Sequence, residues 1–170
     1  MRRALPTAAA LLVAIILQVT IGSRITIFGV PPNFVFLVVI ALALVEGSVA
    51  GCIAGFVGGL LFDLLGSSVV GPHALVLCIV GYVAGLLQAN MFAEGWTLPV
   101  SVVFVASLGS EVAYGAVMAI LGVGVPFIRS FVAVMLPSAV YNAALAVLFY
   151  PVLASFLRRD RTVKSFRRLA

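Results

Sequence analysis

Hydrophobic residues form six long runs along the chain, and short groups of glycine, proline, serine and charged residues separate the runs. Crossing a bilayer as a helix takes roughly 20 apolar residues. The runs therefore predict helices over residues 5–22, 32–45, 48–65, 72–89, 97–121 and 130–156. The second run is short, and the turn at Gly47 is tight, so a five-helix arrangement with a re-entrant or fused segment stays open. The pattern predicts an all-α, polytopic transmembrane helical bundle.

The composition leads to the same fold class. Of the 170 residues, 64% are hydrophobic and 9% are charged, and the mean hydropathy is +1.31. Soluble domains carry about 25% charged residues. We expect residues 1–157 to form a single transmembrane domain and residues 158–170 to form a short basic cytoplasmic tail.

Positive charge lies mostly at the two ends of the chain. Arg2 and Arg3 lie at one end, residues 158–168 hold six basic side chains at the other, and Arg24 and Arg129 fall in loops. Because cytoplasmic segments are rich in lysine and arginine, both termini are predicted to be cytoplasmic, which favours six spans over five. The tail also suits binding to anionic membrane lipids or to a cytoplasmic protein. Topology explains the net charge of +5, so we predict no nucleic acid binding.

Glycine recurs at every fourth position of the third predicted helix. The series runs Gly47, Gly51, Gly55 and Gly59, and Asp63 continues it. Glycines four apart remove side chains from one ridge of a membrane helix and let another helix approach closely. Gly81 and Gly85 repeat the spacing in the fourth helix, so the two helices are candidates to pack on each other. The competing interpretation reserves the ridge for the helix of a partner or for a homodimer, and Gly55→Leu would then abolish partner binding without unfolding the bundle.

Glu111 and Asn142 are polar residues near the centres of the last two predicted helices. A charge at this depth costs about 2.5 to 3.5 kcal/mol on insertion scales, so it calls for an explanation. The two side chains share a hydrogen bond if the helices face each other. With Tyr114 and His73 they form a candidate intramembrane polar site for a substrate or a proton. The alternative is a structural polar contact, with the carboxyl group kept neutral by burial.

Asp63 is expected at the outer end of the third helix, in the same layer as His73, Arg24 and Arg129. An ion pair between Asp63 and one of these arginines would fix the outer rim of the bundle. The alternative for Asp63 is exposure to water among the lipid headgroups. His73 follows a Gly-Pro pair and is predicted to be a turn residue rather than a ligand.

Nothing in the sequence indicates catalysis or a cofactor. One histidine and two cysteines, Cys52 and Cys78, give no metal-ligand spacing, and both cysteines fall inside apolar runs, where they are expected to be small hydrophobic side chains. The chain also lacks the common nucleophile, zinc-protease and phosphate-loop motifs. We predict no metal, no cofactor and no enzymatic activity.

Residues 31–90 carry several short motifs. Pro32-Asn33 opens the second predicted helix, and the third helix contains a G-F-x-x-G-L-x-x-D-L pattern that runs from Gly55 to Leu64. A small polar turn over residues 66–68 leads to Gly71, Ala74-Leu75 and Gly81-Tyr82. This stretch resembles the bacterial rod shape-determining protein MreD family, and the chain length, short loops and expected cytoplasmic termini also suit that family.

The resemblance implies a non-enzymatic scaffold of the cell-elongation machinery in the bacterial inner membrane. Members of the family work with the bitopic protein MreC and, through it, with the RodA glycosyltransferase, a class B penicillin-binding transpeptidase and MreB filaments. The family is also similar in architecture to the S components of energy-coupling-factor vitamin transporters. That similarity supplies the alternative function, a substrate-binding subunit of a small-molecule transporter with an outward pocket at Glu111, Asn142, Tyr114 and His73.

Overall fold

The protein is described by a computed structural model that covers residues 4–22, 24–26, 31–66, 69–87, 97–122, 131–145 and 148. The basic tail, Arg129 and residues 149–156 of the sixth expected helix lie outside these ranges. The described part contains helices and connecting segments and no strand. The elements are α1 (Ala4–Leu17), the π-helix η1 (Gln18–Gly22), α2 (Phe34–Glu46), α3 (Ser48–Leu65), α4 (Pro72–Leu86), α5 (Thr97–Ile120) and the π-helix η3 (Phe131–Met135). Helical structure continues from η3 to residue 145, and we call this whole segment the 131–145 helix.

The helices follow the six apolar runs of the sequence. Only one residue separates α2 from α3, namely Gly47, whose φ of 100° and ψ of −179° break the helical path. A side chain rarely adopts this φ, so a glycine is needed there. Helices α2 and α3 are therefore distinct elements rather than one fused segment.

Two stretches, Ser48–Leu65 and Val100–Ile120, are long and apolar enough to cross a membrane, and the other helices are apolar but shorter. Large hydrophobic side chains cover the outer faces of the bundle. Val49 and Ile53 on α3 are 67% and 60% exposed, and Val105 on α5 is 68% exposed. An apolar exterior of this kind is compatible with lipid rather than water.

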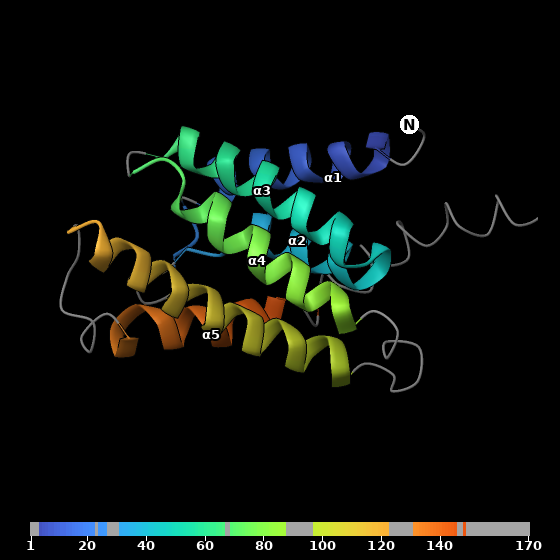
Figure 1. Cartoon of the computed structure of the whole chain (residues 1–170). Coiled ribbons are helices and arrows are strands. Elements are labelled where there is room, and N and C mark those ends of the chain that lie inside the picture. The colour runs from blue at the N-terminus through green and yellow to red at the C-terminus, as the bar shows by residue number, and fades with distance from the viewer. Residues whose placement is uncertain are drawn as a thin grey trace, which may run out of the picture.

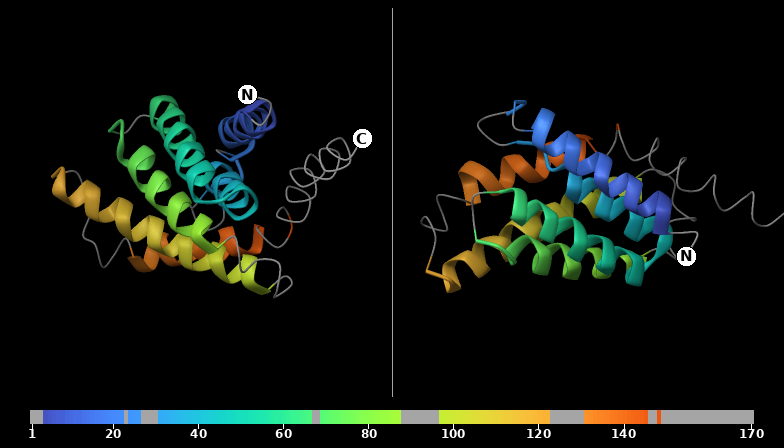
Figure 2. Two further views of the ribbon diagram at one scale, coloured as in Figure 1. Left: turned by 45° about the vertical axis from the view of Figure 1, so that its right-hand side comes forward. Right: turned by 90° about the horizontal axis from the view of Figure 1, so that it is seen from above.

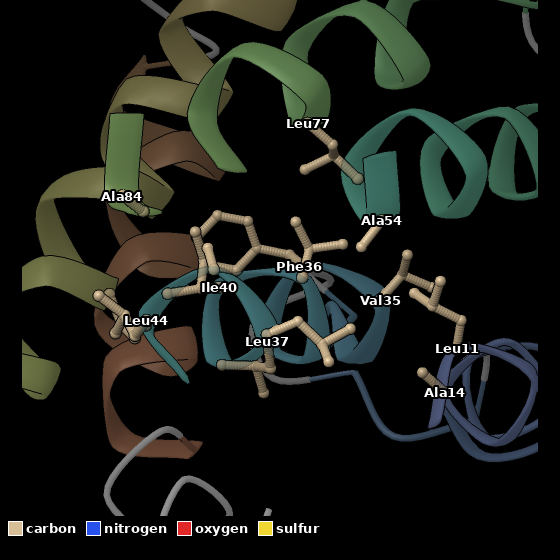
Figure 3. Close-up of a cluster of buried hydrophobic side chains, with 14 of the residues drawn as sticks. Leu11, Ala14, Val35, Phe36, Leu37, Ile40, Leu44, Ala54, Leu77 and Ala84 are labelled. Atoms are coloured by element: carbon tan, nitrogen blue, oxygen red, sulfur yellow. The ribbon is translucent and has the colours of Figure 1, made fainter. Parts of the chain in front are cut away.

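Helix α2 lies at the centre of the bundle and is buried on every side. Ten of its 13 residues are buried, and it packs against α1, α3, α4 and α5. Figure 3 shows its side chains extending toward Leu11 of α1, Ala54 of α3 and Leu77 of α4. A 13-residue helix is only about 20 Å long, whereas the hydrocarbon core is about 30 Å thick. Helix α2 is thus a core helix that neighbouring helices shield from lipid.

The remaining helices are arranged around α2. Helices α3 and α4 lie side by side and antiparallel, and they form the most extensive contact of the bundle (Figure 1). The 131–145 helix crosses α5 at an angle (Figure 2, left), and side-chain hydrogen bonds join the two. The polar side chains singled out in the sequence fall at the contact of α3 with α4 and around α5.

Candidate functional site

The glycines of α3 lie directly against the backbone of α4. A Cβ atom added at Gly55 would lie 2.1 Å from the Leu77 carbonyl oxygen, and one at Gly51 would lie 2.3 Å from the Gly81 carbonyl oxygen. At the end of the contact nearest α4's first turn, a Cβ at Gly59 would lie 2.5 Å from the His73 carbonyl oxygen. No real side chain fits at such distances, so the absence of side chains is what allows the two backbones to meet.

Helix α4 of the same chain therefore packs into the glycine ridge of α3. Gly85 of α4 completes the contact, because a Cβ there would lie 2.4 Å from the Ser48 backbone. In this structure α4 covers Gly51, Gly55 and Gly59, so the ridge packs within the chain, as the interpretation that pairs the two glycine-containing helices expects. Gly58 was not singled out in the sequence, yet it faces Val35 of α2 and Leu11 of α1 and gives α3 a second close contact.

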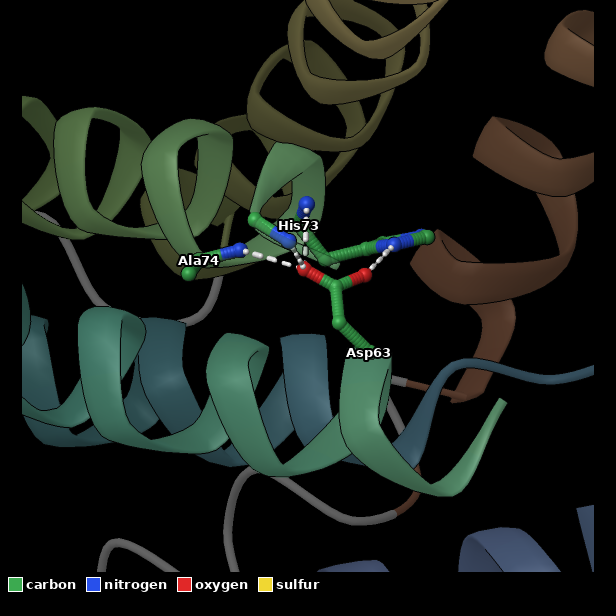
Figure 4. Close-up of polar contacts among 4 residues, drawn as sticks. Asp63, His73 and Ala74 are labelled. Atoms are coloured by element: carbon green, nitrogen blue, oxygen red, sulfur yellow. Dashed lines mark hydrogen bonds and ion pairs between the residues drawn. The ribbon is translucent and has the colours of Figure 1, made fainter. Parts of the chain in front are cut away.

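The carboxylate of Asp63 caps the amino end of α4 (Figure 4). Its Oδ2 atom accepts hydrogen bonds from the backbone N–H groups of Gly71, His73 and Ala74 at 2.9, 3.1 and 3.3 Å. The first N–H groups of a helix have no partner within the helix, and a negative charge is favourable there. The Asp63 residue is only 1% exposed, so these bonds replace the water that the carboxylate loses on burial.

The second oxygen of Asp63 holds the ring of His73. The Oδ1 atom lies 2.6 Å from His73 Nδ1, and the ring centroid of His73 lies 4.2 Å from that of Tyr114 on α5. Asp63, His73 and Tyr114 thus link α3, α4 and α5. Arg24, one of the two arginines expected to pair with Asp63, is exposed, and Arg129 lies outside the described residues. Among the described residues, the partners of Asp63 are the first N–H groups of α4 and the His73 ring.

A second group of polar side chains joins α5 to the 131–145 helix. The Asn142 Nδ2 atom donates to Ser107 Oγ at 2.9 Å and to Ser138 Oγ at 3.4 Å, and Ser138 Oγ donates to Glu111 Oε1 at 2.7 Å. Glu111 and Asn142 therefore connect through Ser138 rather than directly. Ser107, Ser138 and Asn142 are buried. The group resembles the interhelical hydrogen bonds by which polar side chains hold membrane helices together.

Asn142 also completes the amino end of α2. Its Oδ1 atom accepts from the Asn33 backbone N–H at 3.2 Å, while Asn33 Oδ1 caps the Phe36 N–H at 2.9 Å. From the other side, Gln18 of η1 accepts from the Phe34 N–H and donates to the Pro32 carbonyl oxygen, each at 2.8 Å. A short, buried helix needs such partners, because its first N–H groups have no acceptor within the helix.

The candidate polar residues thus have structural partners inside the bundle. His73 and Tyr114 belong to one group, Glu111 and Asn142 to another, and Glu111 and Tyr114 lie three residues apart, on adjacent turns of α5. Gln18, Ser107 and Ser138 were missed in the sequence, although each is a polar residue within an apolar run. Among the described residues, no three histidine, cysteine or acidic side chains gather to hold a metal ion.

The motif positions of the sequence have clear structural roles. Asn33 of the Pro-Asn pair caps α2, Gly55 and Gly59 of the glycine-rich pattern contact α4, and its aspartate, Asp63, caps α4. A comparison with protein families finds a match of residues 1–160 to the family described as rod shape-determining protein MreD. No curated protein and no solved structure matches the chain.

Proposed function

The chain belongs to the rod shape-determining protein MreD family, and from this premise we propose that it is a non-enzymatic scaffold that binds MreC in the bacterial inner membrane. Binding would position the cell-elongation machinery and help to regulate peptidoglycan synthesis. RodA, a class B penicillin-binding transpeptidase and MreB would be reached indirectly, through MreC. The match over residues 1–160 is the observation that carries the proposal.

The proposed topology has six spans and two cytoplasmic termini. Residues 1–157 would form the membrane domain, and residues 158–170 would be the basic cytoplasmic tail. Arg2, Arg3 and the six basic residues after position 157 support this orientation, because positive charge favours the cytoplasmic side. Helix α2 would count as one of the six spans. It is too short to cross the hydrocarbon core alone, so neighbouring helices would cover the remaining thickness.

The partner helix would bind on the outer, apolar surface of the bundle. Two observations support an outer contact: α4 covers the glycine ridge of α3, and the buried polar groups form hydrogen bonds with one another. Large exposed side chains such as Ile53 on α3, Val105 on α5 and Val140 on the 131–145 helix provide candidate contact points. A transmembrane partner meeting such a surface would replace lipid and gain van der Waals contact.

Site-directed photocrosslinking in living cells tests this proposal and locates the interface. A photoreactive residue would be placed in turn at Ile53, Val105 and Val140, which point outward from three different helices. The buried Ala54 is the matched internal control for Ile53, because the two are neighbours on α3 but Ala54 is only 1% exposed. We expect a crosslink to MreC from at least one outward face and none from position 54.

Affinity purification from the native cell supplies the independent measurement. Tagged protein extracted in mild detergent should bring down MreC and the elongation synthases. Recovery of an ATPase and a coupling subunit together with a bound small molecule, and no MreC, would contradict the scaffold and support the transporter alternative.

A further inference from the structure

Cys52 of α3 and Cys78 of α4 face each other across the helix contact. Both are free and half-buried, and their Sγ atoms are 2.7 Å apart. A disulfide bond is about 2.05 Å long, so the two sulfur atoms are already less than about 1 Å beyond bonding distance. We propose that Cys52 and Cys78 form a site of reversible oxidation, at which hydrogen peroxide joins α3 to α4 through an intramolecular disulfide.

The neighbouring backbone contacts hold this pair in position. Cys52 lies between Gly51 and Gly55 in the sequence, and these two glycines contact Gly81 and Leu77, which lie on either side of Cys78. The helices can neither slide nor rotate past one another without bringing other side chains into the space that the glycines leave open. The packed helices therefore hold the backbones of Cys52 and Cys78 opposite each other, within reach of an Sγ–Sγ contact.

The chemistry needs only the two thiols and peroxide. One sulfur attacks a peroxide oxygen, the O–O bond breaks, and water leaves to give a sulfenic acid. The second sulfur attacks the sulfenic sulfur, the S–O bond breaks, and a second water molecule carries away the remaining thiol proton. Two thiols and one hydrogen peroxide thus give one disulfide and two waters, and two electrons pass from the sulfur atoms to the peroxide.

The apolar surroundings of the pair favour peroxide as the oxidant. Cys52 and Cys78 both lie within apolar helices that face lipid on their outer sides, as the exposed Ile53 and Ile79 show. Hydrogen peroxide is small and uncharged and enters such a layer, whereas charged thiols of the glutathione type are poorly soluble in it. The disulfide would therefore outlast those of water-exposed cysteine pairs, which the cytoplasmic thiol pool reduces.

Intact-mass analysis of the full-length protein in lipid nanodiscs tests the proposal. After hydrogen peroxide treatment and removal of the peroxide, the protein would be unfolded in detergent with iodoacetamide and weighed. We expect the wild-type chain to lose the mass of a pair of hydrogen atoms and to resist alkylation, and a dithiol reductant to restore alkylation of both cysteines. Fragmentation should locate the bond between Cys52 and Cys78.

Variants with a single cysteine test whether the loss of mass comes from a bond between Cys52 and Cys78. Cys52→Ala and Cys78→Ala should each retain one thiol that is alkylated or gains oxygen, and neither should lose a pair of hydrogens. The proposal is overturned if both wild-type cysteines are alkylated while a soluble dithiol peptide in the same tube becomes fully oxidised. It is also overturned if a non-reducing gel shows that the only disulfide formed joins two chains.

Discussion

The Gly55→Ala substitution should separate α3 from α4, although it adds a single methyl group. The added Cβ would lie 2.1 Å from the Leu77 carbonyl oxygen, 2.5 Å from the Leu77 carbonyl carbon and 2.8 Å from the Cys78 nitrogen. All three are backbone atoms of a helix, so no rotation of a side chain can relieve the overlap. Carbon and oxygen atoms in close contact normally sit about 3.3 to 3.6 Å apart. The helices must therefore move apart locally by more than about 1 Å.

The cost of this movement follows from the contacts that it weakens. A gap of 0.5 to 1 Å removes about a quarter to a half of each van der Waals attraction across the interface. Extra methyl groups in well-packed cores cost about 1 to 3 kcal/mol, occasionally more. Because the overlap at Gly55 is with backbone, we expect the upper end of this range, about 3 kcal/mol of unfolding free energy.

Two other glycines make a graded set of controls. A Cβ at Gly58 would lie 3.1 and 3.2 Å from methyl groups of Val35 and Leu11, which can shift, so Gly58→Ala should cost about 1 kcal/mol. A Cβ at Gly109 of α5 would meet nothing within 4 Å, so Gly109→Ala should change stability by less than about 0.5 kcal/mol. The expected order of destabilisation is Gly55, then Gly58, then Gly109.

Unfolding in mixed micelles with increasing dodecyl sulfate would measure the stabilities. Alkylation of Cys52 and Cys78 by a membrane-permeant maleimide reports directly on the α3 and α4 contact, because both thiols lie within it. Gly55→Ala should speed this labelling, and Gly109→Ala should not. If Gly55→Ala unfolds at the same detergent fraction as Gly109→Ala and labels at the wild-type rate, the reasoning from close backbone contact is refuted.

Three further changes test the polar groups by the same unfolding titration. Asp63→Ala leaves the first N–H groups of α4 without their acceptor and should cost about 2 to 3 kcal/mol, whereas Asp63→Asn keeps an acceptor oxygen and should cost less. Asn142→Leu leaves the Asn33 N–H and Ser107 without Asn142 and should cost about 1 to 3 kcal/mol. Glu111→Gln keeps an acceptor for Ser138, so the unfolding midpoint should stay close to wild type, and cells carrying it should remain rod-shaped under the microscope.

Each of these expectations has a contradicting result. An Asp63→Ala protein as stable as the wild type would remove the carboxylate from the capping role. An Asn142→Leu protein as stable as the wild type would show that α2 does not need the hydrogen bond between the Asn33 N–H and Asn142. Rounded cells carrying a stable Glu111→Gln protein would mean that the negative charge itself is required, and the structural role given to Glu111 would then be incomplete.

The positions of the helices could be predicted from the sequence, because local signals mark their ends. Gly47 breaks the chain between α2 and α3, and Gly71 with Pro72 begins α4. The all-helical fold class and the family could also be predicted, because apolar runs and short motifs can be recognised without knowledge of the packing. The likeness to transporter S components stays a prediction.

The pairings between helices were not accessible in the same way. A glycine ridge indicates that some helix will approach, but the choice between α4 and an external partner depends on three-dimensional packing. Asp63 lies beside His73, but its capping role could not be predicted, because charge alone suggested only an arginine as its partner. The arrangement instead depends on the free N–H groups at the start of α4, which only the geometry of the turn brings to the carboxylate.

The amino end of α2 has a consequence for how the protein is made. The Phe34 N–H donates to Gln18, which is synthesised before α2. The Asn33 N–H donates to Asn142, which is synthesised 109 residues after Asn33. A nascent chain that has inserted α2 therefore still lacks a hydrogen-bond partner for that helix until the 131–145 helix is made. Insertion and final folding are separated in time, and a ribosome that stalls before residue 142 leaves the central helix of the bundle unfinished.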